Sequence, residues 1–429
     1  SFPSIFLFFN SDTFLITATV MGVISGGLMI VGLLPGITSF VSWVLYLSFV
    51  TVGQEFMSYQ WDVLLLEAGV LLLFFVPWGG SIFNQPTKKP SRLILFMLKL
   101  LLFRLMFTAG VVKLISGDNT WKTFMSLDYH FYTQPLPHFM SWYAHQLPLY
   151  IKKIGVGFAF FVELVVPFLF FMPRRPRHLA FLLTTLFMIF IMATGNYGFF
   201  NILVIVLSFI LLDDYFILSR IPKWVKKMID LRYRVVPERK VRKYLNRGIV
   251  CCLLVPMLYM ESSRFITDRL IVPKPVQFLG GVAQHFRLFS PYGLFAVMTT
   301  KRKEVVIQAS LDGETWKDYE FKWKPGAVNI APKWAFPHQP RLDWQLWFSA
   351  LSTIENNSWM YHYFVKLIQG SESVLSLMGP SPFGNKKPNY IQAQLYDYTF
   401  TELDDMKGTG YWWKRTYVGP YSPTLQLSK

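Results

Sequence analysis

The stretch LILFMLKLLLFRLMFTAGVVKLISGDNTWKTFMSLDYHFYTQPLP, residues 93–137, joins an apolar run to an aromatic segment. Residues 93–112 are almost all apolar, and a helix of about 20 such residues crosses the core of a bilayer. Lys113 follows near the end of this run, and the chain then continues with tryptophan, tyrosines, a histidine and two prolines. The stretch therefore predicts a membrane-spanning helix followed by an aromatic segment at the membrane boundary.

The composition of the whole chain is that of a membrane protein. Of its 429 residues, 53% are hydrophobic and 16% are charged, whereas a soluble domain has about 25% charged residues. Because the bilayer core offers no water to backbone groups, its long apolar runs are expected to be helical. We predict a polytopic α-helical membrane protein with about seven to nine spans. The expected spans lie near residues 13–34, 37–52, 60–77, 93–115, 154–172, 178–194, 197–212 and 248–263.

The net charge of +17 comes from basic segments that lie between apolar runs. The longest is 213–247, and two shorter ones are PTKKPSR (86–92) and PRRPR (173–177). Counting spans places all three on one side, which the positive-inside rule makes the cytoplasm. Residues 116–153 and the chain after about 264 then lie on the far side, in the lumen of the endoplasmic reticulum or in a periplasm. This pattern favours contact with membrane lipid and argues against nucleic acid as a partner.

A second domain follows the predicted spans. KEVVIQASLDGETWKDYEFKWKPG (303–326) alternates like strands around a turn at Asp312-Gly313, and NYIQAQLYDYTFTEL (389–403) is also strand-like. RLDWQLWFSALSTI (341–354) and SWMYHYFVKLIQG (358–370) are typical of helices. We therefore predict a transmembrane domain over 1–264 and a mixed α+β, β-sandwich-like lumenal or periplasmic domain over 265–429.

Ionisable residues inside the apolar runs are costly, so each of them needs a partner or a function. Glu67, Arg104 and Glu163 are expected to pair across helices and fix the packing. Lys113 has two readings: its ammonium group reaches the membrane surface, or its apolar surroundings make it a catalytic proton acceptor with His130 nearby.

Aromatic side chains are the second group of candidate site residues. Trp121, Tyr129 and Tyr132 lie in the far-side loop 116–153, which we expect to form a lid packed over the spans. Trp412 and Trp413 lie in the second domain, and tryptophan and tyrosine are enriched at the centres of binding interfaces. These five residues are our candidates for ligand or client binding.

No motif in the sequence points to a metal or a cofactor. The spacing of His130, His138 and His145 fits no zinc signature. The two cysteines, Cys251 and Cys252, are adjacent within an apolar run and form no redox or zinc pattern. Glycine-rich phosphate loops and the motifs of serine hydrolases, kinases and proteases are also missing from the sequence.

The chain begins at Ser1 within an apolar stretch, without an initiator methionine and without the charged start of a signal peptide. We expect the natural chain to have further residues before Ser1, with room for one more span.

Several long motifs resemble the lipase maturation factor family. They include SFVTVGQEFMSYQWDVLLLEAG (48–69), residues 101–148, TGNYGFFN (194–201) followed by LLDD, PHQPRLDWQLWFSAL (337–351) and WWKRTYVGPY (412–421). The resemblance covers nearly the whole chain in consistent order. It implies a multi-pass protein of the endoplasmic reticulum membrane that assists the folding and assembly of secreted dimeric lipases, in the manner of a chaperone. The family also has compact bacterial members, for which the location would be the inner membrane.

A shorter resemblance concerns Lys113. The segment TAGVVKL, followed by TWKTFMSLDY, is similar to part of vitamin K-dependent gamma-glutamyl carboxylase, where a lysine in such a context serves as a base. It covers about twenty residues of this chain.

Two functions follow from these observations. The first is a maturation factor without a catalysed reaction, which binds clients through exposed aromatic residues. Trp334 is a further candidate for that surface, whereas Trp344 and Trp347 are expected to belong to the core of their helix. The second is a membrane enzyme acting on a lipid or quinone-like substrate, with Lys113 as base and His130 or Glu67 nearby.

Overall fold

The computed structural model describes residues 3–78, 91–228 and 273–426, together with the single residues 248, 254 and 257. The predicted span at 248–263, the predicted domain boundary at 264 and most of the basic loop fall outside these ranges, so those predictions stay open. The described part of that loop forms the short helices α11 (Asp214–Arg220) and α12 (Lys223–Met228).

The chain forms two compact units, and each is assembled from three separate stretches of sequence. We call them the bundle unit and the sheet unit. The bundle unit comprises Ser1–Val112, Val162–Thr185 and Leu203–Leu294. The sheet unit comprises Lys113–Phe161, Leu186–Ile202 and Phe295–Lys429. The aromatic loop 116–153 is therefore part of the same compact body as the C-terminal strands.

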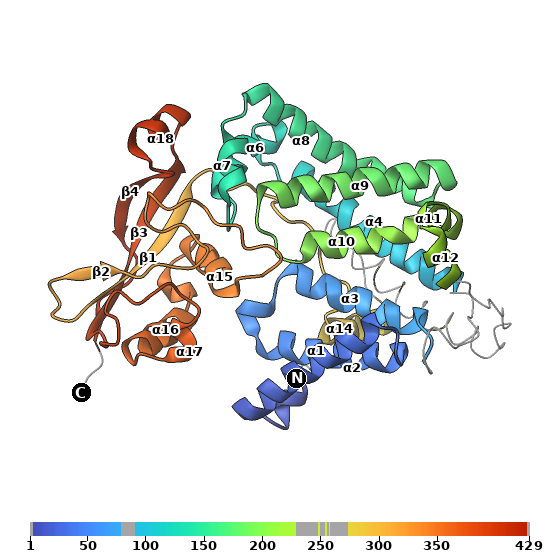
Figure 1. The fold of residues 1–429 in the computed structure, drawn as a ribbon, viewed down its shortest axis with the longest axis horizontal. Helices are drawn as coiled ribbons and strands as arrows, with labels where there is room; N and C mark the ends of the chain where they lie inside the picture. Colours follow the sequence, from blue (N-terminus) through green and yellow to red (C-terminus); the bar gives the residue numbers. More distant parts are fainter. Residues whose placement is uncertain are drawn as a thin grey trace. The chain divides into compact units, whose positions relative to one another are not determined.

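Helices make up most of the described residues in the first half of the chain (Figure 1). The longer ones are α1 (Asp12–Ile30), α2 (Pro35–Val52), α3 (Gln60–Phe75), α4 (Arg92–Ile115), α8 (Leu149–Leu164), α9 (Arg174–Thr194) and α10 (Phe200–Ser208). The short ones are α5 (Asn119–Lys122), α6 (Ser126–Thr133), α7 (Phe139–His145), α11 (Asp214–Arg220), α12 (Lys223–Met228) and the 3-10 helices η1 (Ile5–Leu7), η2 (Gln54–Met57), η3 (Val166–Phe171) and η4 (Phe209–Leu211). Before the C-terminal strands comes α14 (Lys274–His285).

Five helical segments of the described residues are long and apolar enough to cross a membrane. They are α1, α2, α4, Leu149–Phe171 and α9. A sixth is added if Phe200–Leu211 and Asp214–Arg220, which meet at 107°, form one span. The prediction of a multi-span helical protein is confirmed. The described residues contain five or six of the seven to nine predicted spans, and the predicted span at 248–263 lies outside them. One predicted span that falls short is α3, which has only 16 residues, fewer than the roughly 20 that a straight crossing needs.

The bundle unit contains the ion pair that its apolar runs predict. Arg104 Nη1 lies 3.1 Å from Glu67 Oε2, and both side chains are buried. The same two residues hold a later part of the chain, because Glu67 accepts the backbone N–H of Ser290 at 2.6 Å and Arg104 donates to its carbonyl at 3.3 Å. Buried charges need such partners, since an unpaired one costs several kcal/mol. The pair therefore joins α3, α4 and the segment after α14.

The sheet unit contains one five-stranded antiparallel sheet. Its strands are β1 (Arg302–Ser310), β2 (Trp316–Asp318), β3 (Tyr390–Phe400), β4 (Trp413–Pro420) and β5 (Leu425–Gln426). The order is β2-β1-β3-β4, and β5 pairs with the start of β3. The long pairing of β1 with β3 brings Arg302 opposite Tyr398 and Ser310 opposite Tyr390. The turn predicted at Asp312-Gly313 does separate β1 from β2.

The prediction of a mixed α+β domain is confirmed, but its sandwich-like form is not what the described residues contain, because they have no second sheet. Helices α15 (Arg341–Ala350) and α16 (Trp359–Ile368) contact β1 and β3 instead, as the lower left of Figure 1 shows. Trp344 and Trp347 of α15 are 2% and 6% exposed, so their prediction as core residues is confirmed. Further short helices are η5 (Ile354–Asn356), α17 (Glu372–Leu375) and α18 (Leu403–Thr409).

Candidate functional site

Lys113 lies in the last turn of α4 and is buried, with 7% of its surface exposed. Its ammonium nitrogen is 5.1 Å from the centroid of the Trp121 ring, a position in which the ring quadrupole attracts the cation. Trp121 is fixed there because its Nε1 donates to the carbonyl of Phe295 at 3.0 Å and its ring packs against Val156 and Met298. Two predicted site residues, Lys113 and Trp121, are thus neighbours.

A tight turn connects α4 to α5 and sets this geometry. Gly117 has φ 77°, a conformation that glycine adopts without steric cost. Asp118 then caps α5, since its Oδ1 accepts the N–H of Thr120 at 2.7 Å. Its Oδ2 accepts the N–H of Met298 at 2.6 Å. One carboxylate therefore starts the helix and also holds the segment that precedes β1.

His130, the second candidate catalytic residue, lies in α6 beside a buried tyrosine. Its Nε2 is 3.0 Å from the hydroxyl of Tyr197, and that hydroxyl donates to Gln134 Oε1 at 3.0 Å. Because the tyrosine's one hydrogen goes to Gln134, we assign a proton to Nε2 of His130 as the donor. Burial, helped by the charge of Lys113, lowers the pKa of His130 to about 4. Burial also raises the pKa of Tyr197, so both groups are neutral at pH 7.

The amide of Gln134 extends this network to the end of α9. Gln134 is 1% exposed, and its Nε2 donates to the carbonyl of Thr194 at 2.7 Å and to Ser141 Oγ at 3.2 Å. Ser141 Oγ also donates to the carbonyl of Thr194, at 2.7 Å. A buried network of this kind is stabilising only when each member has a partner. The aromatic loop and the segment TGNYGFFN (194–201) are therefore held as one body.

Asn196 connects the same segment to the chain before α15. Its Nδ2 donates to the carbonyl of Lys333 at 2.8 Å, and its Oδ1 accepts the N–H of Ala335 at 2.9 Å. Trp347 of α15 adds a third link, since its Nε1 donates to the carbonyl of Thr133 at 2.9 Å. Together these bonds join three stretches that are far apart in the sequence.

Arg302, at the start of β1, provides the most heavily bonded link. Its guanidinium group donates to the carbonyls of Tyr132, Gln134 and Pro135. It also pairs with Glu304 at 2.6 Å, and Glu304 pairs in turn with Lys324 at 2.9 Å. All three charged side chains are almost completely buried. Arginine suits this position because its planar group presents five donors and stays charged.

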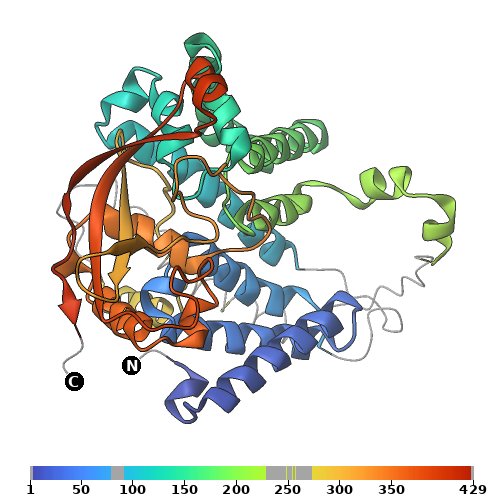
Figure 2. The same cartoon turned by 60° about the vertical axis from the view of Figure 1, so that its left-hand side comes forward.

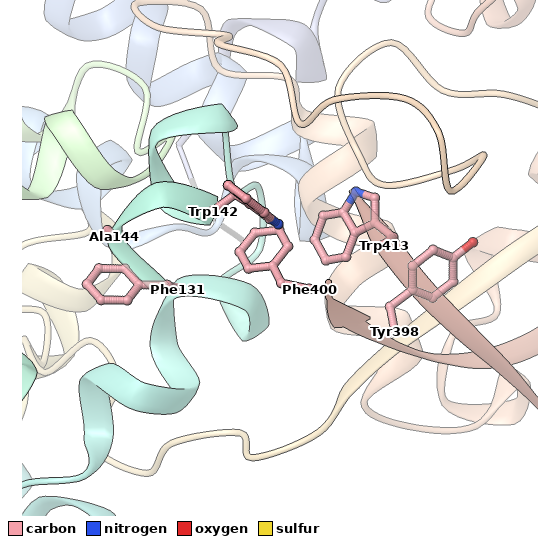
Figure 3. Close-up of a cluster of buried hydrophobic side chains, with 6 residues drawn as sticks. All are labelled: Phe131, Trp142, Ala144, Tyr398, Phe400 and Trp413. Carbon is pink, nitrogen blue, oxygen red and sulfur yellow. The ribbon is translucent and has the colours of Figure 1, made fainter. Parts of the chain in front are cut away.

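The aromatic side chains of the loop and of the sheet meet in one cluster, drawn in Figure 3. Its buried members are Phe131, Trp142, Ala144, Tyr398, Phe400 and Trp413. They come from α6, α7, β3 and β4. Phe400 and Trp413 have ring centroids 4.4 Å apart, and Trp142 lies 5.3 Å from Trp412. Aromatic contacts of this kind each contribute about 0.5–1.5 kcal/mol beyond area burial.

The five predicted binding residues therefore differ in accessibility. Trp121 and Trp413 are buried, with 7% and 1% of their surface exposed, whereas Tyr129, Tyr132 and Trp412 are half-buried. The hydroxyl of Tyr132 donates to the carbonyl of Thr300 at 2.8 Å, and burial raises the pKa of Tyr132 to about 12. The structure gives Trp121, Tyr132, Trp412 and Trp413 a packing role, and a binding role stays a prediction for all five.

Apolar side chains that do face water gather near β4. Tyr417 and Val418 are 55% and 48% exposed, and Tyr411 is 46% exposed. β4 pairs with β3 on one side, and no strand among the described residues pairs with its other side. An open strand edge with apolar side chains is a template for another extended chain. Sequence reasoning missed this surface, because alternation shows a strand without showing whether it lies at an edge.

Sequence reasoning also missed Tyr197, Gln134 and Arg302. Tyr197 lies in the quoted motif TGNYGFFN, which offered a signal, whereas Arg302 lies in the basic run TKRK, which is typical of a solvated surface. Among the residues that the structure describes, no group of three His, Cys, Asp or Glu side chains is arranged to hold a metal ion. Lys113 offers a cation beside the Trp121 ring. His130 offers a neutral hydrogen-bond donor beside the rings of Tyr197 and Phe295.

Two family models match the chain. One is described as the lipase maturation factor transmembrane domain and matches residues 1–219. The other is described as the lipase maturation factor C-terminal domain and matches residues 288–423. The first contains all the candidate spans, which makes the chain a multi-pass membrane protein. No solved structure matches.

Curated relatives are similar to the chain over most of its length. Lipase maturation factor 2 of Xenopus laevis is 34% identical, over 90% of this chain and 68% of its own length. Lipase maturation factor 1 of Mus musculus is 34% identical, over 98% of this chain and 75% of its own length. Lipase maturation factor 2 of Homo sapiens is 31% identical, over 90% of this chain and 68% of its own length.

The buried histidines predict that acid destabilises the sheet unit. Burial lowers the pKa of both His130 and His138 to about 4, below the ordinary value of about 6.5. Their neutral forms therefore stabilise the fold fully above pH 6.5, and this contribution is lost as the pH falls from 6.5 towards 4. We expect the Tm in detergent to fall over that range.

The double variant His130→Gln/His138→Gln should have a lower Tm at pH 7 but a weaker pH dependence below 6.5. The matched control is His362→Gln, at a histidine that is exposed to water, and it should retain the wild-type pH dependence. If the Tm of the double variant depends on pH below 6.5 as steeply as that of the wild type, His130 and His138 are not the cause of the acid destabilisation.

Proposed function

Because this chain belongs to the lipase maturation factor family, we propose that it assists the folding and assembly of secreted dimeric lipases in the membrane of the endoplasmic reticulum. The match of both family models to this one chain is the observation that supports the proposal best. The work is that of a chaperone: it binds a client and needs no catalysed reaction.

The proposed client surface is the open edge of β4. Its exposed Tyr417 and Val418 offer apolar contact, and its free backbone groups offer hydrogen bonds to an extended segment of an unfolded lipase. The charges beside them are already neutralised, since Lys414 pairs with Asp405 and Arg415 lies 3.4 Å from Asp318. Unpaired lysines on an edge strand disfavour its pairing with another chain, and this repulsion is reduced at the edge of β4.

The double variant Tyr417→Ser/Val418→Ser tests the surface. Both residues are exposed, but Tyr417 packs on Tyr396 and donates to Gln394 at 3.0 Å, so the double substitution should cost about 1 kcal/mol. We expect several-fold less active lipase secreted from cells that lack their own maturation factor, from a variant that stays folded with a Tm only slightly below that of the wild type. The matched control is Leu377→Ser, which removes another exposed apolar side chain of the sheet unit (52% exposed). Full activity of the double variant would exclude this edge as the client surface.

We further propose that loop 116–153 and the C-terminal strands of the sheet unit lie in the lumen. Loop 116–153, segment 194–201 and the C-terminal strands belong to one compact body, so they share one side of the membrane. Within the bundle unit, Arg174 of the basic segment 173–177 lies 2.7 Å from Asp213, which supports placing 173–177 and the start of 213–247 on the other side. Basic loops favour the cytoplasm.

Protease protection in sealed microsomes measures this orientation. An epitope added after Lys429 should survive external protease and be digested only after detergent opens the vesicles. Digestion in intact microsomes would reverse the orientation and remove the lumenal client from the proposal.

A membrane enzyme with Lys113 as base is the second candidate function. The observation that favours it is the burial of Lys113 within the influence of His130, whose pKa its charge helps to lower. The contact with Trp121 favours a positioning role instead, since it uses the charged form of the lysine.

Lys113→Arg separates the two functions. Arginine keeps a cation for the Trp121 ring, but it cannot act as a base because it stays protonated. We expect Lys113→Arg to retain lipase maturation in the secretion assay, whereas Lys113→Met loses about 1–2 kcal/mol of stability with the cation–π contact. Loss of all activity in Lys113→Arg at wild-type Tm would favour the base.

A further inference from the structure

The bundle unit contains an elongated pocket of about 420 Å³ between α1, α2 and α3. On α1 its lining includes Ala18, Gly22, Gly26 and Met29, which recur on one face of the helix. On α2 the lining extends from Ser39 to Phe49, and on α3 from Leu65 to Leu72. Val23 also lines it and is 72% exposed, so the pocket opens at the surface of the bundle unit. Figure 2 shows α1 and α2 side by side.

Glycines create this space. Gly26 has no atom within 4 Å of the position that a Cβ would take, so a side chain there would enter the pocket. Gly69 on α3 allows the Trp43 ring to approach, because a Cβ at that position would lie 2.8 Å from Trp43 Cδ1. The pocket is thus the result of small residues on α1 and of a close contact between α2 and α3.

The polar groups of the lining are bonded within the protein. Ser42 Oγ donates to Ser25 Oγ at 3.1 Å, and Ser39 Oγ contacts Met29 Sδ at 3.2 Å. Trp43 Nε1 donates to a carbonyl of α3, and Thr19 Oγ1 donates to a carbonyl of its own helix. Tyr46 OH donates to Asp62 Oδ1 at 2.5 Å. A molecule bound in the pocket would therefore contact a mostly hydrocarbon surface, because the hydroxyl and indole groups of the lining already have hydrogen-bond partners within the protein.

The length of the lining indicates the kind of molecule that the pocket can hold. From Ala18 to Met29 the lining of α1 rises about 16 Å, which is about half of the roughly 30 Å hydrocarbon core, or one leaflet. The apolar lining thus extends over the depth that one acyl chain of a single leaflet occupies.

Water in this pocket would find few hydrogen-bond partners, and leaving the pocket empty would forfeit dispersion contacts along its whole lining. Both α1 and α2 are candidate membrane spans, so hydrocarbon surrounds the opening. We propose that this pocket binds one acyl chain of a membrane phospholipid, with the headgroup outside the pocket. The site is separate from the proposed client surface and does not depend on the proposed function.

Photo-crosslinking tests the site in the full chain. The protein is reconstituted in vesicles of phosphatidylcholine that contain a trace of the same lipid with a diazirine in one acyl chain. After irradiation, mass spectrometry of peptides measures labelling of the lining residues of α1, α2 and α3. We expect the wild type to be labelled there more strongly than on the outward residues Val20 and Ile24 of α1, which are 50% and 57% exposed.

Gly26→Leu places a side chain in the pocket and should lower labelling of the lining several-fold. Gly27→Leu is the matched control: it adds the same group one residue away, at a glycine that is outside the lining and also has open space around it. In the Gly27→Leu variant the lining residues should be labelled as strongly as in the wild type. Val23→Phe, at the exposed opening, provides a second blocking variant if Gly26→Leu fails to fold.

Three results would overturn the proposal. Equal labelling of wild type and both blocking variants would mean that the lining is not occupied. Labelling of the wild type confined to outward residues would indicate surrounding lipid only. Labelling by a diazirine fatty acid, with none by the phospholipid, would assign the pocket to a free acid.

Discussion

The buried guanidinium group of Arg302 is the interaction on which the sheet unit depends. It bonds the carbonyls of Tyr132, Gln134 and Pro135, at the point where prolines 135 and 137 end α6 and leave backbone acceptors without helical partners. Glu304 neutralises the guanidinium and Lys324 balances Glu304. Burying these charges is costly unless each is paired, so the loop, β1 and the segment after β2 are held in one arrangement.

The bundle unit uses the same device. Glu67 and Arg104 satisfy each other, and they also satisfy both backbone groups of Ser290, a residue more than 180 positions further along the chain. In a membrane domain this matters more than in water, because irregular backbone has no solvent to bond. In both units a buried ion pair therefore fixes a non-helical segment against helices that were formed from distant sequence.

These connections explain why an aromatic loop between two spans belongs to the proposed working part of the molecule. Loop 116–153 forms half of the aromatic cluster that packs with β3 and β4 (Figure 3). The start of β4 packs into this cluster through Trp413, whose ring centroid lies 4.4 Å from that of Phe400. On the proposal that β4 binds the client, a strand already held by packing at one end loses less entropy on binding.

The sequence by itself determined the helical spans and the family, because apolar runs such as 93–112 can only be helices in a bilayer and because the long motifs survive in order. It also determined the core position of Trp344 and Trp347, which follows from the helical period. It did not determine that β4 is an edge, that Trp413 is buried, or that Arg302 bonds Pro135. Those features depend on which distant segments meet, and a local pattern of residue types contains no information about a partner that lies some 170 positions away. Only the tertiary structure, through buried charges and packed rings, decided them.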